Sequence, residues 1–148
     1  MVPAISIAAP SRRSRRSWTS MNSSPSDPEH PDRQQRIGRR YEDQAARFLE
    51  QHGFDILERN WRAGRKEVDI IARRASLLVF VEVKADLTGA FGHPAERVDR
   101  SKIRHLTEAA QRYLLEKQIS GCDCRFDVIT FADGKLEHYP DAFPAASD

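Results

Sequence analysis

An unbroken apolar run at residues 77–81, Leu-Leu-Val-Phe-Val, constrains the fold more than any other part of the sequence. Because the run lacks the alternation of a half-exposed strand, it predicts a central strand covered on both faces. Glu82 and Lys84 follow directly, and side chains two apart in a strand share a face. A charge there is costly unless a partner residue, a metal ion or a substrate compensates it. We therefore take Glu82 and Lys84 as candidate functional residues.

A second acid, Asp69, lies in another run with strand character, at residues 67–72. The link between the two runs is short and polar, which predicts an antiparallel hairpin. A turn of either two or four residues places Asp69 and Glu82 on one face, opposite or diagonal, with roughly 5 or 7 Å between their Cβ atoms. Two carboxylates so close raise one pKa unless a cation lies between them. Mg²⁺ binds through one or two carboxylates, water and phosphate oxygens, so the layout with Lys84 suits metal-assisted phosphodiester hydrolysis.

Asp69 followed by Glu82-Val83-Lys84 resembles the PD-(D/E)XK signature of restriction-endonuclease-like nucleases. Residues 36–143 also resemble the YraN-type family of small bacterial proteins, because five segments occur in the same order. These segments are Arg36-Ile37-Gly38 with Tyr41-Glu42, Arg59-Asn60-Trp61-Arg62, Glu67-Val68-Asp69-Ile70-Ile71, Phe80-Val81-Glu82-Val83-Lys84 and Arg125-Phe126-Asp127-Val128.

This resemblance implies an α/β fold with a restriction-endonuclease-like core, in which helices flank a mixed sheet of four to five strands in αβββαβ order. It implies that Asp69 and Glu82 bind Mg²⁺ or Mn²⁺, with Glu42 as a further ligand, and that Lys84 is the lysine of the signature. The main-chain carbonyl of Val83 is another candidate ligand. Two positions depart from the family pattern: Lys66 replaces a usual glycine, and Ala85-Asp86 replaces a frequent Thr-Arg.

Three interpretations of these residues follow. The first is a metal-dependent endonuclease acting on DNA, with branched or damaged DNA as candidate substrates, in which Lys84 orients or deprotonates the attacking water. The second is a non-catalytic nucleic-acid-binding module that retains the nuclease fold, which the added anion at Asp86 favours. The third is structural, with Lys84 as an ion-pair partner of Asp69 or Glu82 and no metal.

We divide the chain into a disordered tail at residues 1–35, an endonuclease-like domain at residues 36–143 and a C-terminal tail at residues 144–148. The first segment is rich in Ser, Arg and Pro and shows neither helical nor strand periodicity. Within the domain, the pattern predicts two helices, five strands and a Gly- and Pro-containing loop. The predicted helices span 36–52 and about 99–120, the strands 54–62, 67–72, 77–84, 125–131 and 135–139, and the loop 88–98.

Asp127 interrupts the apolar strand at residues 125–131. It could neighbour a metal site, or it could be a buried acid that pairs with Arg125 or Arg62, and we favour the pairing. We therefore predict a structural role for Asp127.

Charge distribution limits the nucleic-acid surface. Residues 1–35 hold five arginines and three acids, and the rest of the chain holds 19 basic and 19 acidic residues. Phosphate affinity must therefore come from local clusters, and the candidate DNA-binding residues are Arg62, Lys66, Lys102 and Arg104. The two cysteines, Cys122 and Cys124, have neither zinc nor redox spacing, so we expect free thiols in a reducing cytoplasm.

No apolar run approaches the ~20 residues of a membrane span, so we expect no membrane association. Resolvase-like nucleases, which are relatives of the restriction-endonuclease-like family, are often dimers. The resemblance therefore makes a homodimer a candidate assembly.

Overall fold

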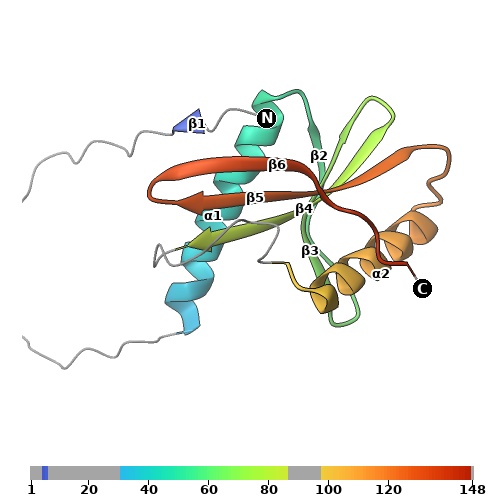
Figure 1. Cartoon of the computed structure of the whole chain (residues 1–148), viewed down its shortest axis with the longest axis horizontal. Helices are drawn as coiled ribbons and strands as arrows, with labels where there is room; N and C mark the ends of the chain where they lie inside the picture. Colours follow the sequence, from blue (N-terminus) through green and yellow to red (C-terminus); the bar gives the residue numbers. More distant parts are fainter. Residues whose placement is uncertain (1–4, 7–30, 87–97, 148) are drawn as a thin grey trace, which may run out of the picture.

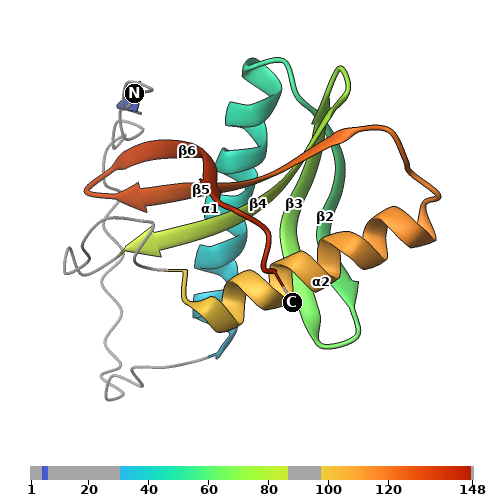
Figure 2. The ribbon, with the colours of Figure 1, turned by 45° about the vertical axis from the view of Figure 1, so that its right-hand side comes forward.

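The computed structural model of the protein describes residues 5–6, 31–86 and 98–147. Two helices flank one mixed sheet (Figures 1 and 2). The helices are α1 (Pro31–Gln51) and α2 (Arg100–Glu116). The strands are β1 (Ile5–Ser6), β2 (Asp55–Ala63), β3 (Lys66–Arg74), β4 (Leu77–Asp86), β5 (Asp123–Ala132) and β6 (Lys135–Phe143). The α/β class and the αβββαβ order of the main elements are therefore as predicted.

The sheet has the strand order β1-β6-β5-β4-β3-β2. Strands β4 and β5 are parallel over ten residue pairs, from Leu77↔Asp123 to Asp86↔Ala132, and every other neighbouring pair is antiparallel. Parallel strands need a long crossover connection, which here contains α2. The crossover brings the start of α2 back across the sheet toward the C-terminal half of β4.

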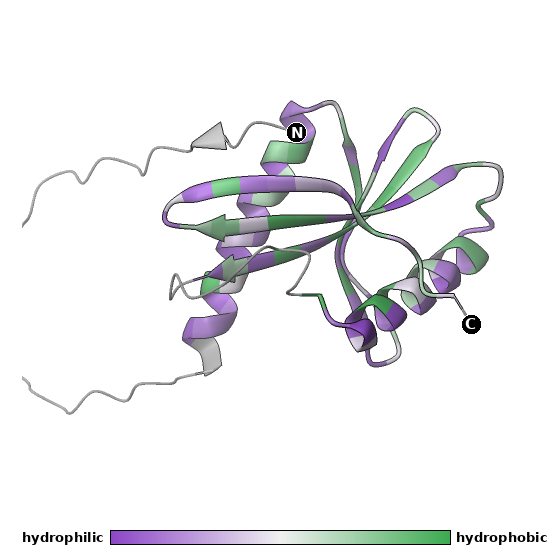
Figure 3. Ribbon diagram, viewed as in Figure 1, coloured by the Kyte–Doolittle hydropathy of each residue, from purple (hydrophilic) through white to green (hydrophobic). Residues whose placement is uncertain are grey.

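Strand β4 is buried on both faces, as its apolar run predicts. Leu78 and Phe80 belong to one core cluster together with Leu106 of α2. Val79 and Val81 belong to a second cluster, which is packed against α1. In Figure 3 the hydrophobic colouring accordingly runs along the middle of the sheet. The sheet thus separates two apolar layers, and Glu82 continues the face that carries Phe80.

The N-terminal boundary differs from the prediction. Helix α1 starts at Pro31 rather than at residue 36, and Ile5–Ser6 forms a short strand against β6 although residues 1–35 were expected to be disordered throughout. Proline is well suited to the first helical turn, where its missing N–H group costs nothing. Two residues are too few to show a strand period, so the sequence pattern could not predict β1.

The observed C-terminal ends of α1, α2 and β6 can be compared with the predicted ones. Gly53, with φ of 83°, ends α1 as predicted, whereas α2 ends at Glu116, four residues before the expected Ser120. Strand β6 continues to Phe143, and the Ala146 N–H group then donates to the Thr107 hydroxyl at 2.9 Å. The predicted loop at residues 88–98 lies, except for Val98, outside the described residues.

None of the helices in the described ranges is long and apolar enough to cross a membrane.

Candidate functional site

The β3–β4 hairpin brings Asp69 and Glu82 together. Its turn consists of Ala75 and Ser76, and its ladder runs from Arg74↔Leu77 to Ile70↔Val81. Asp69 and Glu82 occupy the next positions, where the ladder ends. This register is one of the two that the short polar link predicted. The two carboxylates therefore meet at the point where β3 and β4 diverge.

Asp69 takes over the hydrogen bonding where the ladder stops. Its Oδ2 atom accepts a hydrogen bond from the Val83 N–H group at 2.8 Å. Because the N–H and C=O groups of one residue in an extended strand face the same edge, the Val83 carbonyl also faces this edge. A carboxylate and a main-chain carbonyl, both hard oxygen ligands, thus lie on one side of β4.

Burial and the neighbouring charge of Glu82 raise the pKa of Asp69 from 3.8 to about 7. The Val83 N–H group opposes this shift, Glu42 adds to it, and the ammonium group of Lys102 opposes it. Asp69 therefore exchanges its proton near neutral pH, where a bound cation would favour the ionised form.

Glu82 is almost fully buried, with 3% of its surface exposed. Its Oε1 atom lies 3.2 Å from the Nζ atom of Lys84 and 3.2 Å from that of Lys102. Its Oε2 atom is buried and has no hydrogen-bond partner among the described residues. A buried acceptor without a partner costs free energy, so this oxygen is a candidate ligand for a cation.

The donor set fits a hard divalent cation that takes few protein ligands. Within the parts of the chain that the structure describes, no three His, Cys, Asp or Glu side chains are arranged to hold a metal. Glu42, the predicted further ligand, instead accepts a hydrogen bond from the Asn60 side chain at 3.0 Å. Mg²⁺ commonly uses one or two carboxylates and completes its shell with water and phosphate oxygens. Asp69 and Glu82 supply that minimum, with the buried Oε2 atom of Glu82 available to a cation.

The four candidate DNA-binding residues do not form one cluster. Lys102 reaches the acid pair, as described above. Arg62 pairs with Glu67 at 3.3 Å on the β2–β3 hairpin, and Lys66 forms an ion pair with Glu108 of α2. Arg104 is exposed on α2. Among these four residues, only Lys102 contacts Glu82.

A side chain of the protein already caps the first turn of α2. Asp99 caps the helix, and its carboxylate accepts a hydrogen bond from the Lys102 N–H group at 2.8 Å. Lys102 therefore contributes to the site through its side chain. Its contact with Glu82 was missed, although its position four residues before the buried Leu106 places it beside the packed face of α2.

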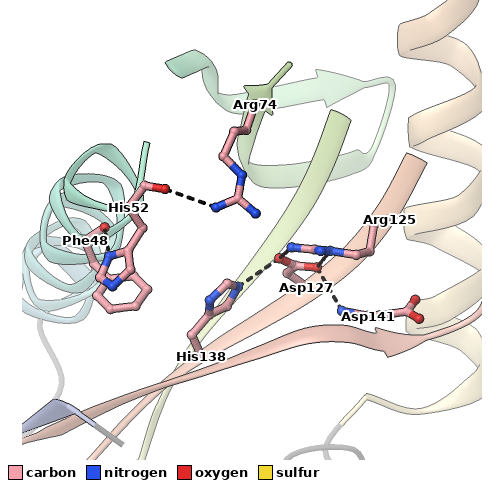
Figure 4. A network of polar contacts seen from close by, with 7 residues as sticks. All are labelled: Phe48, His52, Arg74, Arg125, Asp127, His138 and Asp141. Carbon is pink, nitrogen blue, oxygen red and sulfur yellow. Dashed lines mark hydrogen bonds and ion pairs between the residues drawn. The ribbon is translucent and has the colours of Figure 1, made fainter. Parts of the chain in front are cut away.

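Asp127 lies in a separate polar network, shown in Figure 4, as its predicted structural role requires. The side chain is fully buried. Its oxygens accept two hydrogen bonds from Arg125, at 2.7 and 2.9 Å, and one from the Asp141 N–H group at 3.0 Å. The Nε2 atom of His138 lies 2.8 Å away. Burial alone would raise the pKa of Asp127, but the hydrogen bonds from His138, Arg125 and Asp141 outweigh burial and lower it.

Asp69 also gives a prediction for stability in the absence of metal. Because its pKa is about 7 in the folded protein and ordinarily 3.8, the folded state holds an extra proton between these values. The free energy of unfolding contributed by Asp69 is therefore greatest below about pH 4 and falls as the pH rises through about 7. Urea unfolding in the presence of a chelator should show this fall in the wild-type protein and a smaller one in Asp69→Asn. Parallel pH dependences of the two proteins would contradict the shifted pKa.

The fold and the site together define a class of α/β protein. In this class the central strands of a mixed sheet carry an Asp (Asp69) and a Glu–x–Lys motif (Glu82 and Lys84), and a helix supplies a further lysine (Lys102). Comparison with known proteins identifies the family. The chain belongs to the uncharacterised protein family UPF0102, whose model matches residues 41–131. UPF0102 is the YraN-type family that the ordered sequence segments predicted.

Several relatives support the assignment over most of the domain. The chain is 39% identical to the UPF0102 protein of Persephonella marina over 106 residues, which cover 72% of this chain and 91% of that protein. It is 43% identical to the UPF0102 protein of Chlorobium chlorochromatii over 119 residues, covering 72% and 90%. Among solved structures, the Pyrococcus furiosus protein SfsA in complex with Ca²⁺ matches 75% of this chain and 63% of its own at 12% identity. The TM-score of that match is 0.27.

Proposed function

We propose that the protein is a metal-dependent endonuclease that hydrolyses DNA phosphodiester bonds. The observation that carries this proposal is the buried Oε2 atom of Glu82, which has no hydrogen-bond partner among the described residues and lies beside Asp69, whose pKa is raised to about 7. Two carboxylates held this close in a largely buried position are stabilised by a cation. The neighbouring lysines offer contacts for an anionic substrate, so the site combines groups for a cation with groups for a phosphate.

The residues of the site would have distinct roles. Asp69, Glu82 and the Val83 carbonyl would hold Mg²⁺ or Mn²⁺, and Glu42 would contribute through water. A divalent cation would neutralise charge on the phosphodiester and make water a better nucleophile. The side chain of Lys84 is 37% exposed, and its ammonium group can orient the attacking water and stabilise negative charge that develops on the phosphate.

A second candidate function is a nucleic-acid-binding module without catalysis. It is favoured by the two lysines on Glu82, because their ammonium groups already neutralise the Oε1 atom without a metal. It is also favoured by the balance of 19 basic and 19 acidic residues beyond residue 35. This candidate predicts DNA binding that survives the loss of both carboxylates, whereas a nuclease requires them for cleavage.

The test is a cleavage panel of linear, nicked, flapped and four-way DNA, with and without Mn²⁺. The wild-type protein and Glu82→Gln are purified side by side, because the variant keeps the size of the side chain and reports any contaminating nuclease. We expect the wild type to cut at least one substrate in a Mn²⁺-dependent manner and the variant to cut none. Equal cleavage by both proteins, or none by the wild type, would reject the nuclease.

The same panel addresses substrate and assembly. Preferential cleavage of flapped or four-way DNA would support branched DNA as the substrate. A homodimer would present two sites, which suits paired cuts in opposite strands. Sedimentation of the protein with and without four-way DNA measures that assembly directly.

A further inference from the structure

One oxygen atom of Glu82 is shared by ammonium groups from two different elements. Lys84 comes from the same strand, whereas Lys102 comes from α2, and each Nζ atom lies 3.2 Å from Oε1. The side chain of Lys102 is 34% exposed, so it is accessible from solvent while it contacts an almost fully buried carboxylate. Glu82 carries one negative charge and the two ammonium groups carry two positive charges, so the presence of the second lysine calls for an explanation beyond Glu82 itself.

The charges around the site provide one. The acids Glu42, Asp69 and Glu82 and the lysines Lys84 and Lys102 are charged side chains that belong to the acid pair or act on it. With Asp69 ionised, these side chains carry one net negative charge. A divalent cation alone would turn this into one net positive charge, and a phosphodiester, which carries one negative charge, would restore neutrality. Cation and phosphodiester should therefore favour each other's binding.

We propose that Lys102 is a positioning residue that makes cation binding at Asp69 and Glu82 depend on a bound phosphodiester. Without the phosphodiester, its ammonium group stays on Glu82 and opposes the cation. With one, the ammonium group contacts the phosphate and leaves Glu82 to the cation. The inference rests on the proposed function and names a regulation of the same site.

Lys102 suits this role better than Lys84. It belongs to a separate element, so it can shift toward a phosphate without moving β4, where Glu82 is anchored. Its charge also acts on Asp69, the other carboxylate of the pair. Because coupling between two ligands is reciprocal, a bound cation should strengthen DNA binding by the same factor by which DNA strengthens cation binding.

The experiment titrates Mn²⁺ calorimetrically into the full-length protein, with and without a saturating DNA duplex whose linkages are phosphorothioates. Gel analysis after each titration verifies that the duplex is intact. For the wild type, we expect the Mn²⁺ affinity to rise about tenfold with DNA. For Lys102→Met, we expect tighter Mn²⁺ binding than the wild type without DNA, and a gain from DNA of no more than about twofold. Lys102→Arg, which keeps the charge, should restore most of the gain.

The matched control is Arg112→Met. Arg112 also lies on α2 and is exposed, and it pairs with Glu116 at 3.7 Å, so its loss removes the same charge from the same helix. It should behave like the wild type. If Lys102→Met keeps the wild-type affinity and gain, or if Arg112→Met changes as much as Lys102→Met, the coupling role is overturned while the cation site stands. If the wild type binds no Mn²⁺ under either condition, the proposed nuclease falls as well.

Discussion

Replacing Asp69 with asparagine should reduce Mn²⁺-dependent DNA cleavage by about three orders of magnitude while leaving the fold intact. Asparagine has the same shape and keeps an oxygen that can accept the Val83 N–H hydrogen bond of 2.8 Å. It removes the negative charge that the cation requires. Because the carboxylate of Asp69 is disfavoured in the folded protein without metal, its removal should not lower the midpoint of thermal unfolding at about pH 8.

This combination of lost activity with unchanged or increased stability distinguishes a functional acid from a structural one. Initial cleavage rates and unfolding midpoints, measured on the same preparations, provide both readouts. Asp43→Asn is the matched control, because Asp43 is a half-exposed acid on α1 that pairs with Arg59 at 2.7 Å and is not a member of the acid pair. Cleavage by Asp69→Asn at a rate near that of Asp43→Asn would remove Asp69 from the mechanism.

Replacing Asp127 with alanine should lower the free energy of unfolding by about 3–5 kcal/mol. The substitution leaves the guanidinium group of Arg125 and the ring of His138 without their acceptor in the interior, and the N–H group of Asp141 also loses its partner. Native proteins are stable by only about 5–15 kcal/mol, so the loss is a large fraction of the total. Urea denaturation followed by circular dichroism measures it.

Asp43→Ala serves as the control for this substitution, because its pair with Arg59 has the same 2.7 Å separation but partly exposed side chains. A pair in that position contributes about 0–1 kcal/mol. A comparable loss in the two variants would show that burial of Asp127 does not determine its importance. The stabilisation from Asp127 should also disappear as the pH falls below the usual range for aspartate, because its pKa is lowered in the folded state.

Local sequence patterns predicted much of the acid pair. The polar link between two apolar runs fixed the β3–β4 hairpin, and the two-residue periodicity of strands then placed Asp69 beside Glu82. The pairing of Asp127 with Arg125 follows from the same periodicity, since side chains two apart share a face. These features depend on residues that are close in sequence or joined by one short turn, which is why they could be predicted.

Contacts between distant elements could not be predicted in the same way. The distance between Lys102 and Glu82 depends on how α2 docks on the sheet through side chains such as Leu106, and no local pattern encodes that orientation. Strand β6 was expected to end before Pro140. It continues through Pro140, which lies in the irregular stretch between the pairs Val128↔Tyr139 and Phe126↔Phe143, and proline is tolerated at such irregularities.

The parallel alignment of β4 with β5 has a consequence for the order of folding events. The β2–β3–β4 meander consists of contacts between near neighbours in sequence, whereas β5 must return to β4 from dozens of residues away. Loop-closure entropy makes such distant pairings slow to form. The chain should therefore bring Asp69 and Glu82 together early and add Lys102 only when the crossover docks. Charge repulsion between the two acids would destabilise the isolated β3–β4 hairpin until α2 docks and brings Lys102 to Glu82.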